Sequence, residues 1–254
     1  MSGQLAVVGL GPGDARWLTP EADNALAQAD ALYGYGPYLD RVPSRSGQCR
    51  FPSDNREEAA RAAAALRHAA QGARVALVSG GDPGVFAMAA AVCAEIEKGP
   101  DRWRTLDVVV IPGITAMLAV AARAGAPLGH DFCALSLSDN LKPWELIVRR
   151  LVAAAEVGFV IAIYNPVSRA REWQLAAAFD ELRLRLTAAT PVVFGRAIGR
   201  ADEKVAITTL AAADPSEADM ATLIIVGSAE TRLITRPGRS PLVYTPRAVE
   251  SVSV

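Results

Sequence analysis

The stretch VALVSGGDPGVFAM, residues 75–88, decides how this chain folds. Its first four residues are apolar and include two β-branched side chains, which predicts a buried strand at Val75–Val78. Ser79–Gly84 is a cluster of turn residues, and the Ala-rich helical pattern of Val85–Glu97 follows it. A strand, a tight loop and a helix in this order mark the place where an open α/β sheet binds its ligand. The adjacent glycines allow a close backbone approach and Asp82 is the one charge in the loop, although the same residues also suit a plain turn.

The same alternation of strand and helix runs through the first half of the chain. Apolar strand patterns at Leu5–Gly9, Ala31–Tyr33 and Val108–Ile111 each run into a turn rich in Gly or Pro. Thr19 followed by Pro20 predicts a helix start, with Thr as N-cap and Pro at the first helical position. Alternating strands and helices predict a mainly parallel sheet with helices on both faces. The loops that follow its strands should then share one edge of that sheet.

A break at Gly125–Gly129 ends this alternation, so we predict one α/β domain at 1–126 and a second at 127–254. The weak alternation of His130–Ser138 predicts an antiparallel strand or a sheet edge. The tail from Pro237 to Val254 is predicted to be irregular and partly disordered at its end. The remaining patterns predict a mixed sheet, with helices at Lys142–Glu156 and Ser168–Leu186 and strands at Phe159–Tyr164, Pro191–Gly195, Lys204–Thr208 and Leu223–Val226.

Composition excludes several classes of function. The 254 residues are 51% hydrophobic with a net charge of -1, and no basic stripe of the kind that nucleic-acid binding needs is present. The first residues lack the features of a signal peptide, and no apolar run nears the roughly 20 residues of a membrane span. Cys49, Cys93 and Cys133 form neither a disulfide framework nor a CxxC site, and His68 and His130 are the only histidines. We therefore expect a cytoplasmic protein without a metal site.

The glycine loop of residues 9–14, GLGPGD, invites a dinucleotide interpretation that its chemistry opposes. Its spacing is G-x-G-x-G rather than G-x-G-x-x-G. Pro12 lacks the backbone N–H that a pyrophosphate would need, and Asp14 places a carboxylate where phosphate charges would sit. The loop suits an uncharged or cationic ligand, or acid–base chemistry.

Taken together, the motifs resemble those of the tetrapyrrole methylases, from about Leu5 to Arg247. GGDP is typical of the whole family, while LSLSDNLKPWE and YNP are most similar to its ring-contracting members, which methylate C17 of precorrin-3B in cobalamin biosynthesis. The resemblance implies a homodimer of two α/β domains, with S-adenosylmethionine folded in the crevice between them and S-adenosylhomocysteine as product. Its other motifs are GLGPGD at 9–14, PGITA at 112–116, GHDF at 129–132, IAIYNPVSR at 161–169, FGRAIGR at 194–200, VAITTL at 205–210 and LIIVG at 223–227.

The resemblance also implies a set of cofactor contacts. S-adenosylmethionine carries a sulfonium, an ammonium, a carboxylate and a ribose diol but no phosphate, so it needs neutral hydrogen bonds, an acidic acceptor and an apolar slot for adenine. Asp82 can accept from the ribose or the ammonium, and no protein nucleophile is required. Carried over residue by residue, the cofactor contacts are Gly80, Gly81, Asp82, Val85, Phe86, Thr115, Ala116, Tyr164, Asn165, Ala197 and Thr222.

Ring contraction moves protons, so one or two acid–base groups are expected, and Asp14 and His130 are the candidates. His130 could equally be a hinge residue bonded to backbone. Arg169 and Arg171 would open the helix from Ser168, where cations oppose the macrodipole, which indicates an anionic contact or a solvated face. The candidate substrate contacts are Pro12, Tyr35, Lys142, Arg169 and Arg196. The alternatives are another precorrin or tetrapyrrole methylase, and a non-catalytic nucleotide-binding module on the same fold.

Overall fold

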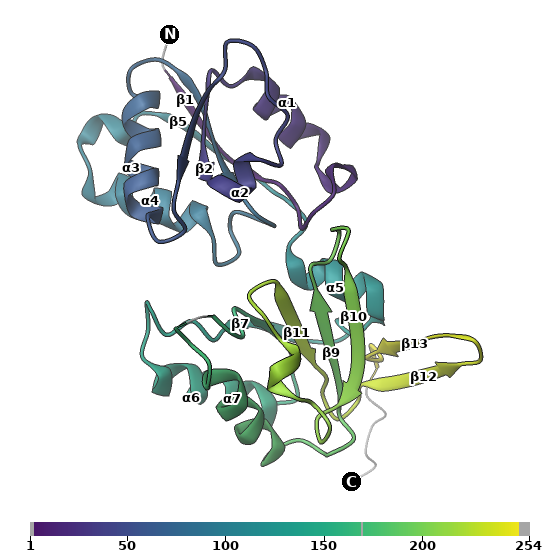
Figure 1. The fold of residues 1–254 in the computed structure, drawn as a ribbon. Helices are drawn as coiled ribbons and strands as arrows, with labels where there is room; N and C mark the ends of the chain where they lie inside the picture. Colours follow the sequence, from purple (N-terminus) through teal and green to yellow (C-terminus); the bar gives the residue numbers. More distant parts are fainter. Residues whose placement is uncertain (1–2, 169, 249–254) are drawn as a thin grey trace. The chain divides into compact units, whose positions relative to one another are not determined.

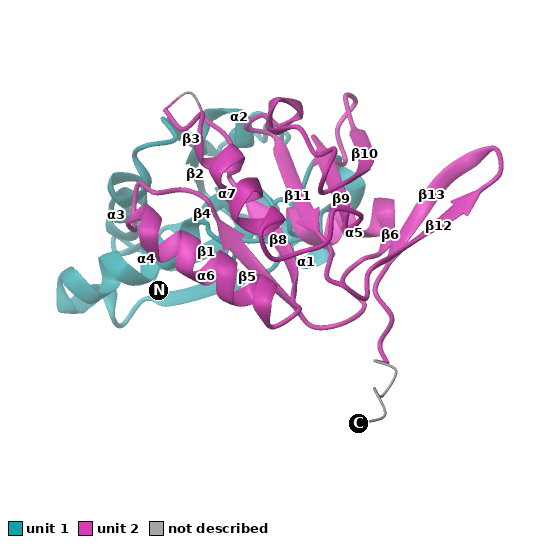
Figure 2. Ribbon diagram, turned by 90° about the horizontal axis from the view of Figure 1, so that it is seen from below, with its two compact units in different colours: residues 1–115 teal, residues 116–254 magenta. Residues whose placement is uncertain are grey.

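The computed structural model describes residues 3–168 and 170–248. The chain divides into two compact units, Met1–Thr115 and Ala116–Val254 (Figures 1 and 2). The sequence places the domain boundary one helix later, after helix α5 (Ala116–Ala124), whose residues contact strands of the second unit. Each unit is an α/β structure, as the alternation of strand and helix patterns predicts.

Unit 1 is built on a parallel sheet with strand order β3-β2-β4-β1-β5. Figure 1 shows α3 and α4 on one side of this sheet and α1 on the other. The strands are β1 (Gln4–Gly9), β2 (Ala31–Tyr35), β3 (Cys49–Ser53), β4 (Arg74–Ser79) and β5 (Asp107–Ile111), and the helices are α1 (Pro20–Gln28), α2 (Gly36–Leu39), α3 (Glu58–Ala69) and α4 (Met88–Lys98).

Alternating residues of the central strands bury both faces of this sheet. Leu5 and Val7 of β1 belong to the core beneath α3 and α4, while Val8 belongs to the core beneath α1. The predicted start of α1 is confirmed, because Thr19 Oγ1 accepts a hydrogen bond from Ala22 N at 3.1 Å and Pro20 is the first helical residue. Burial on both faces explains why these strands read as continuous apolar runs.

Unit 2 contains a mixed sheet with strand order β10-β9-β11-β8-β7. Phe179 of α7 and Leu151 of α6 are fully buried in the core on one face. α5 packs against the other, where a Cβ at Gly195 would lie 2.2 Å from Val120 Cγ2. The elements are β6 (Gly125–Ala126), β7 (Phe132–Ser136), α6 (Trp144–Glu156), β8 (Val160–Tyr164), α7 (Gln174–Arg183), β9 (Pro191–Arg196), β10 (Lys204–Thr209), β11 (Thr222–Val226), β12 (Arg232–Arg236) and β13 (Arg239–Tyr244).

Two helices begin later than their sequence patterns predict. α4 begins at Met88 rather than Val85, because Phe86 has a φ of 51°, outside the right-handed helical region. α7 begins at Gln174 rather than Ser168, because Ser168 and Arg171 pair through their backbones as an isolated bridge. Arg171 therefore precedes the helix, and Arg169 lies outside the described residues.

Of the two alternatives predicted for His130–Ser138, the sheet edge is confirmed and the antiparallel strand is wrong, and the prediction for the tail needs correction. β7 is an edge strand, but it pairs with β8 in parallel and not antiparallel. The tail is not irregular from Pro237, since β13 forms an antiparallel hairpin with β12 that turns at Gly238, where φ is 67°. The predicted disorder at the end of the chain concerns residues 249–254, which lie outside the described residues.

Within the described ranges, the structure contains no helix long and apolar enough to cross a membrane. The same residues bring together no group of three or more His, Cys, Asp or Glu side chains that could hold a metal ion.

Candidate functional site

Three loops of unit 1 meet at one edge of its sheet, as the strand pattern predicts. Gly9 is in register with Ser79, and Val8 is in register with Ile111, so the loops that follow β1, β4 and β5 share the carboxyl edge. Gly11 and Gly81 exchange two backbone hydrogen bonds of 3.1 and 3.0 Å. The GLGPGD and GGDP loops are thereby joined directly to each other.

The glycines of these loops are required by contacts within the protein. A Cβ at Gly9 would lie 2.6 Å from Gly113 N, and one at Gly113 would lie 2.3 Å from Gly81 O. A Cβ at Gly80 would lie 2.6 Å from Cζ of Tyr38. Backbone packs on backbone at Gly9 and Gly113, and the Tyr38 ring packs on Gly80, so these glycines make room for their neighbours whatever ligand is bound.

Replacing Gly113 with Ala is expected to destabilise the protein by about 1–3 kcal/mol, because the new methyl group would overlap the carbonyl of Gly81. The free energy of unfolding measured in urea tests this expectation. Gly36→Ala is the matched control: no atom lies within 4 Å of a Cβ there, and a change below about 0.5 kcal/mol is expected. Equal unfolding midpoints for Gly113→Ala and the unmutated protein would contradict the loop packing.

Asp82 joins the GGDP loop to the loop after β5. Its Oδ1 accepts a hydrogen bond from Gly84 N at 2.8 Å, and its Oδ2 accepts one from Gly113 N at 3.1 Å. Both carboxylate oxygens thus organise backbone, a role that the sequence pattern did not reveal. Each oxygen keeps a second lone pair that can accept from a ligand.

Five backbone N–H groups of the three loops are used inside the protein. Leu10 N donates to Ser79 O, and Gly11 N and Gly81 N donate to each other's carbonyls. The N–H groups of Gly84 and Gly113 donate to the Asp82 carboxylate. A phosphate site at such loops needs several N–H groups that point at the ligand. The five N–H groups engaged in this way are not available to a phosphate, and the phosphate-free ligand inferred from Pro12 and Asp14 stays a prediction.

Asp14 has a local structural contact that the sequence did not predict. Its Oδ1 caps the short helix Ala15–Trp17 by accepting from Arg16 N at 2.9 Å, and Oδ2 lies 3.7 Å from Arg16 Nε. The side chain is about half exposed. A surface pair of this kind leaves the carboxylate open to water and ligands.

The sequence analysis missed Arg41, whose side chain binds backbone carbonyls of the GLGPGD loop. One terminal nitrogen of its guanidinium donates to the carbonyls of Leu10, Gly11 and Gly13 at 2.9, 2.9 and 3.0 Å. Arg41 is some thirty residues away in sequence, and no motif links it to the loop. Only the turn that follows α2 brings it there.

Strained backbone marks the predicted cofactor residues. In the part of the chain that the structure describes, the non-glycine residues with positive φ are Phe86, Asn165 and Ala197, at 51°, 50° and 49°. This conformation costs on the order of 1–3 kcal/mol per residue and is concentrated at functional sites. All three residues belong to the cofactor set implied by the family resemblance.

The sheet of unit 2 gathers the other predicted cofactor residues at one edge. Ser136 at the end of β7 is in register with Tyr164 at the end of β8, and Thr222 is in register with Arg196. Ile224 pairs with Ile163, so the start of β11 lies beside the end of β8. The phenol oxygen of Tyr164 accepts from Met117 N at 3.1 Å, which brings the start of α5, including Ala116, to the same edge.

Asn165 is held in its strained conformation by side chains from two other segments. Its Nδ2 donates to Ser136 Oγ at 3.0 Å, and its carbonyl accepts from Arg171 Nη1 at 2.8 Å. Arg171 is buried, so its position before α7 gives it a structural contact and not an exposed charge.

A second network supports Ala197 and Thr222. Asp219 Oδ1 accepts from Thr222 Oγ1 at 2.8 Å, and its Oδ2 accepts from Arg196 Nε at 2.7 Å. Burial by itself would raise the pKa of Asp219, but hydrogen bonds from Thr222 and Arg196 hold it below its ordinary value. Arg196 also binds Asp202 at 2.7 Å, so two carboxylates of the protein already face this predicted substrate residue.

His130 lies at the other edge of the unit 2 sheet. It precedes β7, and Ser136 ends that strand, so the five residues of β7 separate the two edges by about 13 Å. His130 Nδ1 accepts from Asp131 N at 2.7 Å, the backbone contact expected of a hinge residue. Within unit 2, His130 is thus far from Tyr164 and Asn165, and its catalytic role stays a prediction.

The other predicted residues are placed as follows. Tyr35 ends β2 at the carboxyl edge of unit 1, with its ring perpendicular to that of Tyr38 at a centroid distance of 5.4 Å. Burial, followed by the charge of Arg150, lowers the pKa of Lys142. The half-buried Pro12 and Val85 belong to the first two loops of unit 1, and Thr115 is buried at the end of that unit.

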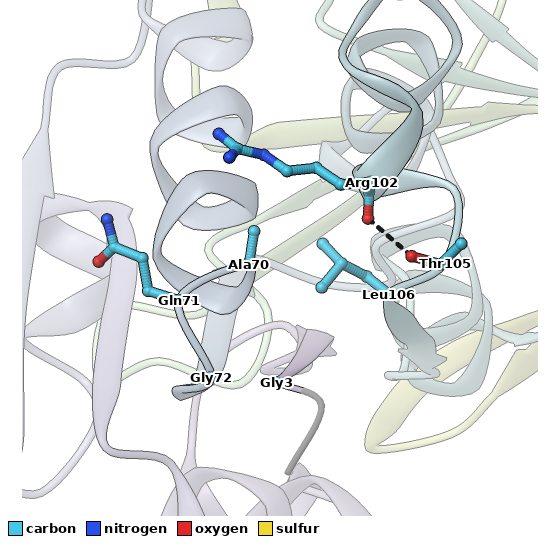
Figure 3. Close-up of a pocket in the computed structure, with 7 residues that line it drawn as sticks. All are labelled: Gly3, Ala70, Gln71, Gly72, Arg102, Thr105 and Leu106. Atoms are coloured by element: carbon cyan, nitrogen blue, oxygen red, sulfur yellow. Dashed lines mark hydrogen bonds between the residues drawn. The ribbon is translucent and has the colours of Figure 1, made fainter.

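A hollow of about 360 Å³ lies away from these loops, at the amino edge of unit 1 (Figure 3). It is lined by Gly3, by Ala70–Gly72 after α3, and by Arg102, Thr105 and Leu106. Thr105 Oγ1 donates to the carbonyl of Arg102 at 3.0 Å. No predicted site residue lines it.

Sequence comparison matches residues 4–214 to the Tetrapyrrole (Corrin/Porphyrin) Methylases. The chain belongs to this family and is a methyltransferase, so the resemblance noted in the sequence is confirmed.

The precorrin-3B C(17)-methyltransferase of a Sinorhizobium species is 62% identical over 97% of this chain and 97% of that protein. The cobalamin biosynthesis protein CobIJ of Mycobacterium tuberculosis is 50% identical over 97% of this chain, which spans 48% of CobIJ. Among solved structures, the methyltransferase CobJ matches with a TM-score of 0.91 and 46% identity, over 96% of this chain and 100% of that chain. Uroporphyrin-III C-methyl transferase from Thermus thermophilus, complexed with S-adenyl homocysteine, matches at 24% identity with a TM-score of 0.66, over 89% and 97% of the two chains, and shares the fold.

Proposed function

We propose that this protein transfers a methyl group from S-adenosylmethionine to C17 of precorrin-3B and contracts the macrocycle, as a step of cobalamin biosynthesis. The observation that carries the proposal is its 62% identity, over nearly the full length of both chains, to a protein of that activity. The strained backbone of Asn165 and Ala197 in unit 2 supports the choice of cofactor, and so do the N–H groups of the unit 1 loops that are already bonded within the protein.

The residues present fit S-adenosylmethionine. Loops whose N–H groups are used internally still offer carbonyls and the outer lone pairs of Asp82 to an ammonium or a ribose diol. The strained backbone of Phe86, Asn165 and Ala197 fixes main-chain groups in directions that ordinary loops do not provide. Gly80, Gly81, Asp82, Val85, Phe86 and Thr115 of unit 1, and Ala116, Tyr164, Asn165, Ala197 and Thr222 of unit 2, would hold the cofactor.

When bound, the cofactor supplies an electrophilic methyl group on sulfur. The protein's own contribution to methyl transfer is alignment, because an electron-rich ring carbon of the substrate is itself the nucleophile. Ring contraction needs a proton moved, and the exposed carboxylate of Asp14 at the carboxyl edge of unit 1 is the residue we assign to it. Pro12 and Tyr35 at the same edge, and Lys142 in unit 2, would contact the substrate.

Arg169 and Arg196 are the remaining proposed substrate contacts. Arg196 already binds Asp202 and Asp219, and these hydrogen bonds raise the pKa of its guanidinium. We therefore propose that Arg196 supports Thr222 and Ala197, in addition to any contact that it makes with the substrate. We further propose that the protein acts as a cytoplasmic homodimer.

S-adenosylhomocysteine should raise the melting temperature, while NAD and ATP should leave it unchanged. A ligand that binds only the folded state at 100 times its Kd adds about 2.7 kcal/mol of stability. For a chain of this size, that corresponds to a rise of about 5 °C or more. Differential scanning fluorimetry with the three compounds measures it. A shift with NAD or ATP and none with S-adenosylhomocysteine would favour a nucleotide-binding module instead.

A second candidate function concerns the metal content of the substrate. The probable cobalt-factor III C(17)-methyltransferase of Salmonella typhimurium is 42% identical over 96% of this chain and 98% of that protein. The higher identity to the precorrin-3B protein favours the cobalt-free substrate. Turnover of each substrate, followed by mass spectrometry of the product, separates these two reactions from that of another tetrapyrrole methylase.

A further inference from the structure

Two loops of unit 2 lie side by side, and the second of them begins at Asn165. Residues 137–143 connect β7 to α6, and residues 165–173 connect β8 to α7. Gln174 Nε2 donates to Asp139 Oδ2 at 3.0 Å, and Arg171 Nε lies 4.0 Å from Asp139 Oδ1. Both loops follow the carboxyl ends of parallel strands, the edge at which α/β sheets bind their ligands.

These loops expose large apolar side chains to water. Trp173 is 53% exposed and Leu141 is 92% exposed. The Trp173 ring is fixed by an edge-to-face contact with Trp144, with 5.0 Å between centroids and 72° between planes. We call Leu141, Lys142, Trp144 and Trp173 the Trp rim. A rigid, partly exposed indole offers an apolar surface at a small cost in conformational entropy.

Basic and acidic side chains both border the Trp rim, and the basic ones are in excess. Lys142 and Arg150 lie close enough for the charge of Arg150 to lower the pKa of Lys142, after the larger effect of burial. Among the nearby carboxylates, Asp139 is already bound by Gln174 and Arg171, while Glu145 and Glu172 are exposed. Basic residues outnumber acidic ones across residues 139–150 and 165–174. An anionic ligand would relieve the repulsion between Lys142 and Arg150.

We propose that the Trp rim binds the substrate macrocycle, with the indole of Trp173 against the apolar ring face and Lys142 paired with a peripheral carboxylate. A flat conjugated ring edged with carboxylates matches an aromatic platform beside a cation. The identity of the macrocycle as a precorrin rests on the proposed function. The rim itself needs only a flat, anionic tetrapyrrole.

Trp173→Ala tests the platform. It should weaken binding of uroporphyrin, a stable polycarboxylate porphyrin, by about tenfold when followed by the porphyrin's own fluorescence. KM for the precorrin should rise by about the same factor, while kcat and the affinity for S-adenosylhomocysteine stay unchanged. Trp173→Phe should restore part of the affinity. Leu184→Ala, at an exposed apolar residue just after α7, is the control and should change nothing.

Lys142→Gln tests the ion pair. It should weaken uroporphyrin binding by about tenfold at low salt, and the difference from the unmutated protein should shrink as ionic strength rises. The neutral amide removes the charge and keeps a polar side chain that is one atom shorter.

Several results would overturn the Trp rim. Equal binding of uroporphyrin by Trp173→Ala and the unmutated protein would reject the Trp rim, and so would binding by neither of them. A change of molar mass in sedimentation for Trp173→Ala would instead assign the rim to contact with a second copy of the chain. If the unmutated protein binds uroporphyrin through Trp173 but methylates no precorrin, the rim stands and the proposed reaction fails.

Discussion

Asp14→Asn is expected to slow conversion of the precorrin by roughly 10²–10⁴-fold while leaving the affinity for S-adenosylhomocysteine unchanged. Asn is as good an N-cap as Asp, so the hydrogen bond from Arg16 N to residue 14 should survive. The substitution therefore removes the titratable group and keeps the turn. Single-turnover rates and the absorption spectrum of the product measure the effect, and a methylated but uncontracted macrocycle would identify proton transfer as the lost step.

His130→Gln is the natural comparison for Asp14→Asn. His130 lies at the opposite edge of the unit 2 sheet from Asn165 and accepts from the backbone of Asp131, so near-normal rates are expected. A loss of turnover comparable to that of Asp14→Asn would return His130 to the catalytic set. Should both variants form the contracted product at unmutated rates, proton transfer within the substrate becomes the better explanation.

Asp82→Ala is expected to weaken binding of S-adenosylhomocysteine by about 1.5–3 kcal/mol, or roughly 10- to 150-fold in Kd. The loss has two sources. A charged acceptor for the cofactor disappears, and the N–H groups of Gly84 and Gly113 lose the carboxylate that holds their loops together. Titration calorimetry measures the affinity, and circular dichroism should show an unchanged fold because the change lies at loop tips.

Asp101→Ala is the matched control for Asp82→Ala. Asp101 is an exposed carboxylate of unit 1 at the start of the short helix Asp101–Trp103, and its partner Arg104 is three residues away on the surface. Its removal should change stability by less than about 1 kcal/mol and should leave cofactor affinity intact. An unchanged affinity in Asp82→Ala would reduce the GGDP loop to a plain turn.

The sequence alone determined the features that depend on residues close together along the chain. The strand at Val75–Val78 and the Thr19-Pro20 start of α1 were predicted correctly. A short apolar run and a helix cap each involve only a few consecutive residues, so both can be recognised in the sequence. Alternating strands and helices likewise predicted a parallel sheet, and hence three loops at one edge of unit 1.

Only the tertiary structure decided which residues support those loops. Arg41 reaches the carbonyls of Leu10, Gly11 and Gly13, and Asp219 reaches Arg196, across distances in sequence that no local pattern covers. The parallel pairing of β7 has the same origin, whereas α4 and α7 begin late because of the local backbone at Phe86 and at Ser168–Arg171. The register between strands arises from long-range contacts, and such contacts overrule an alternating pattern that is only a local preference.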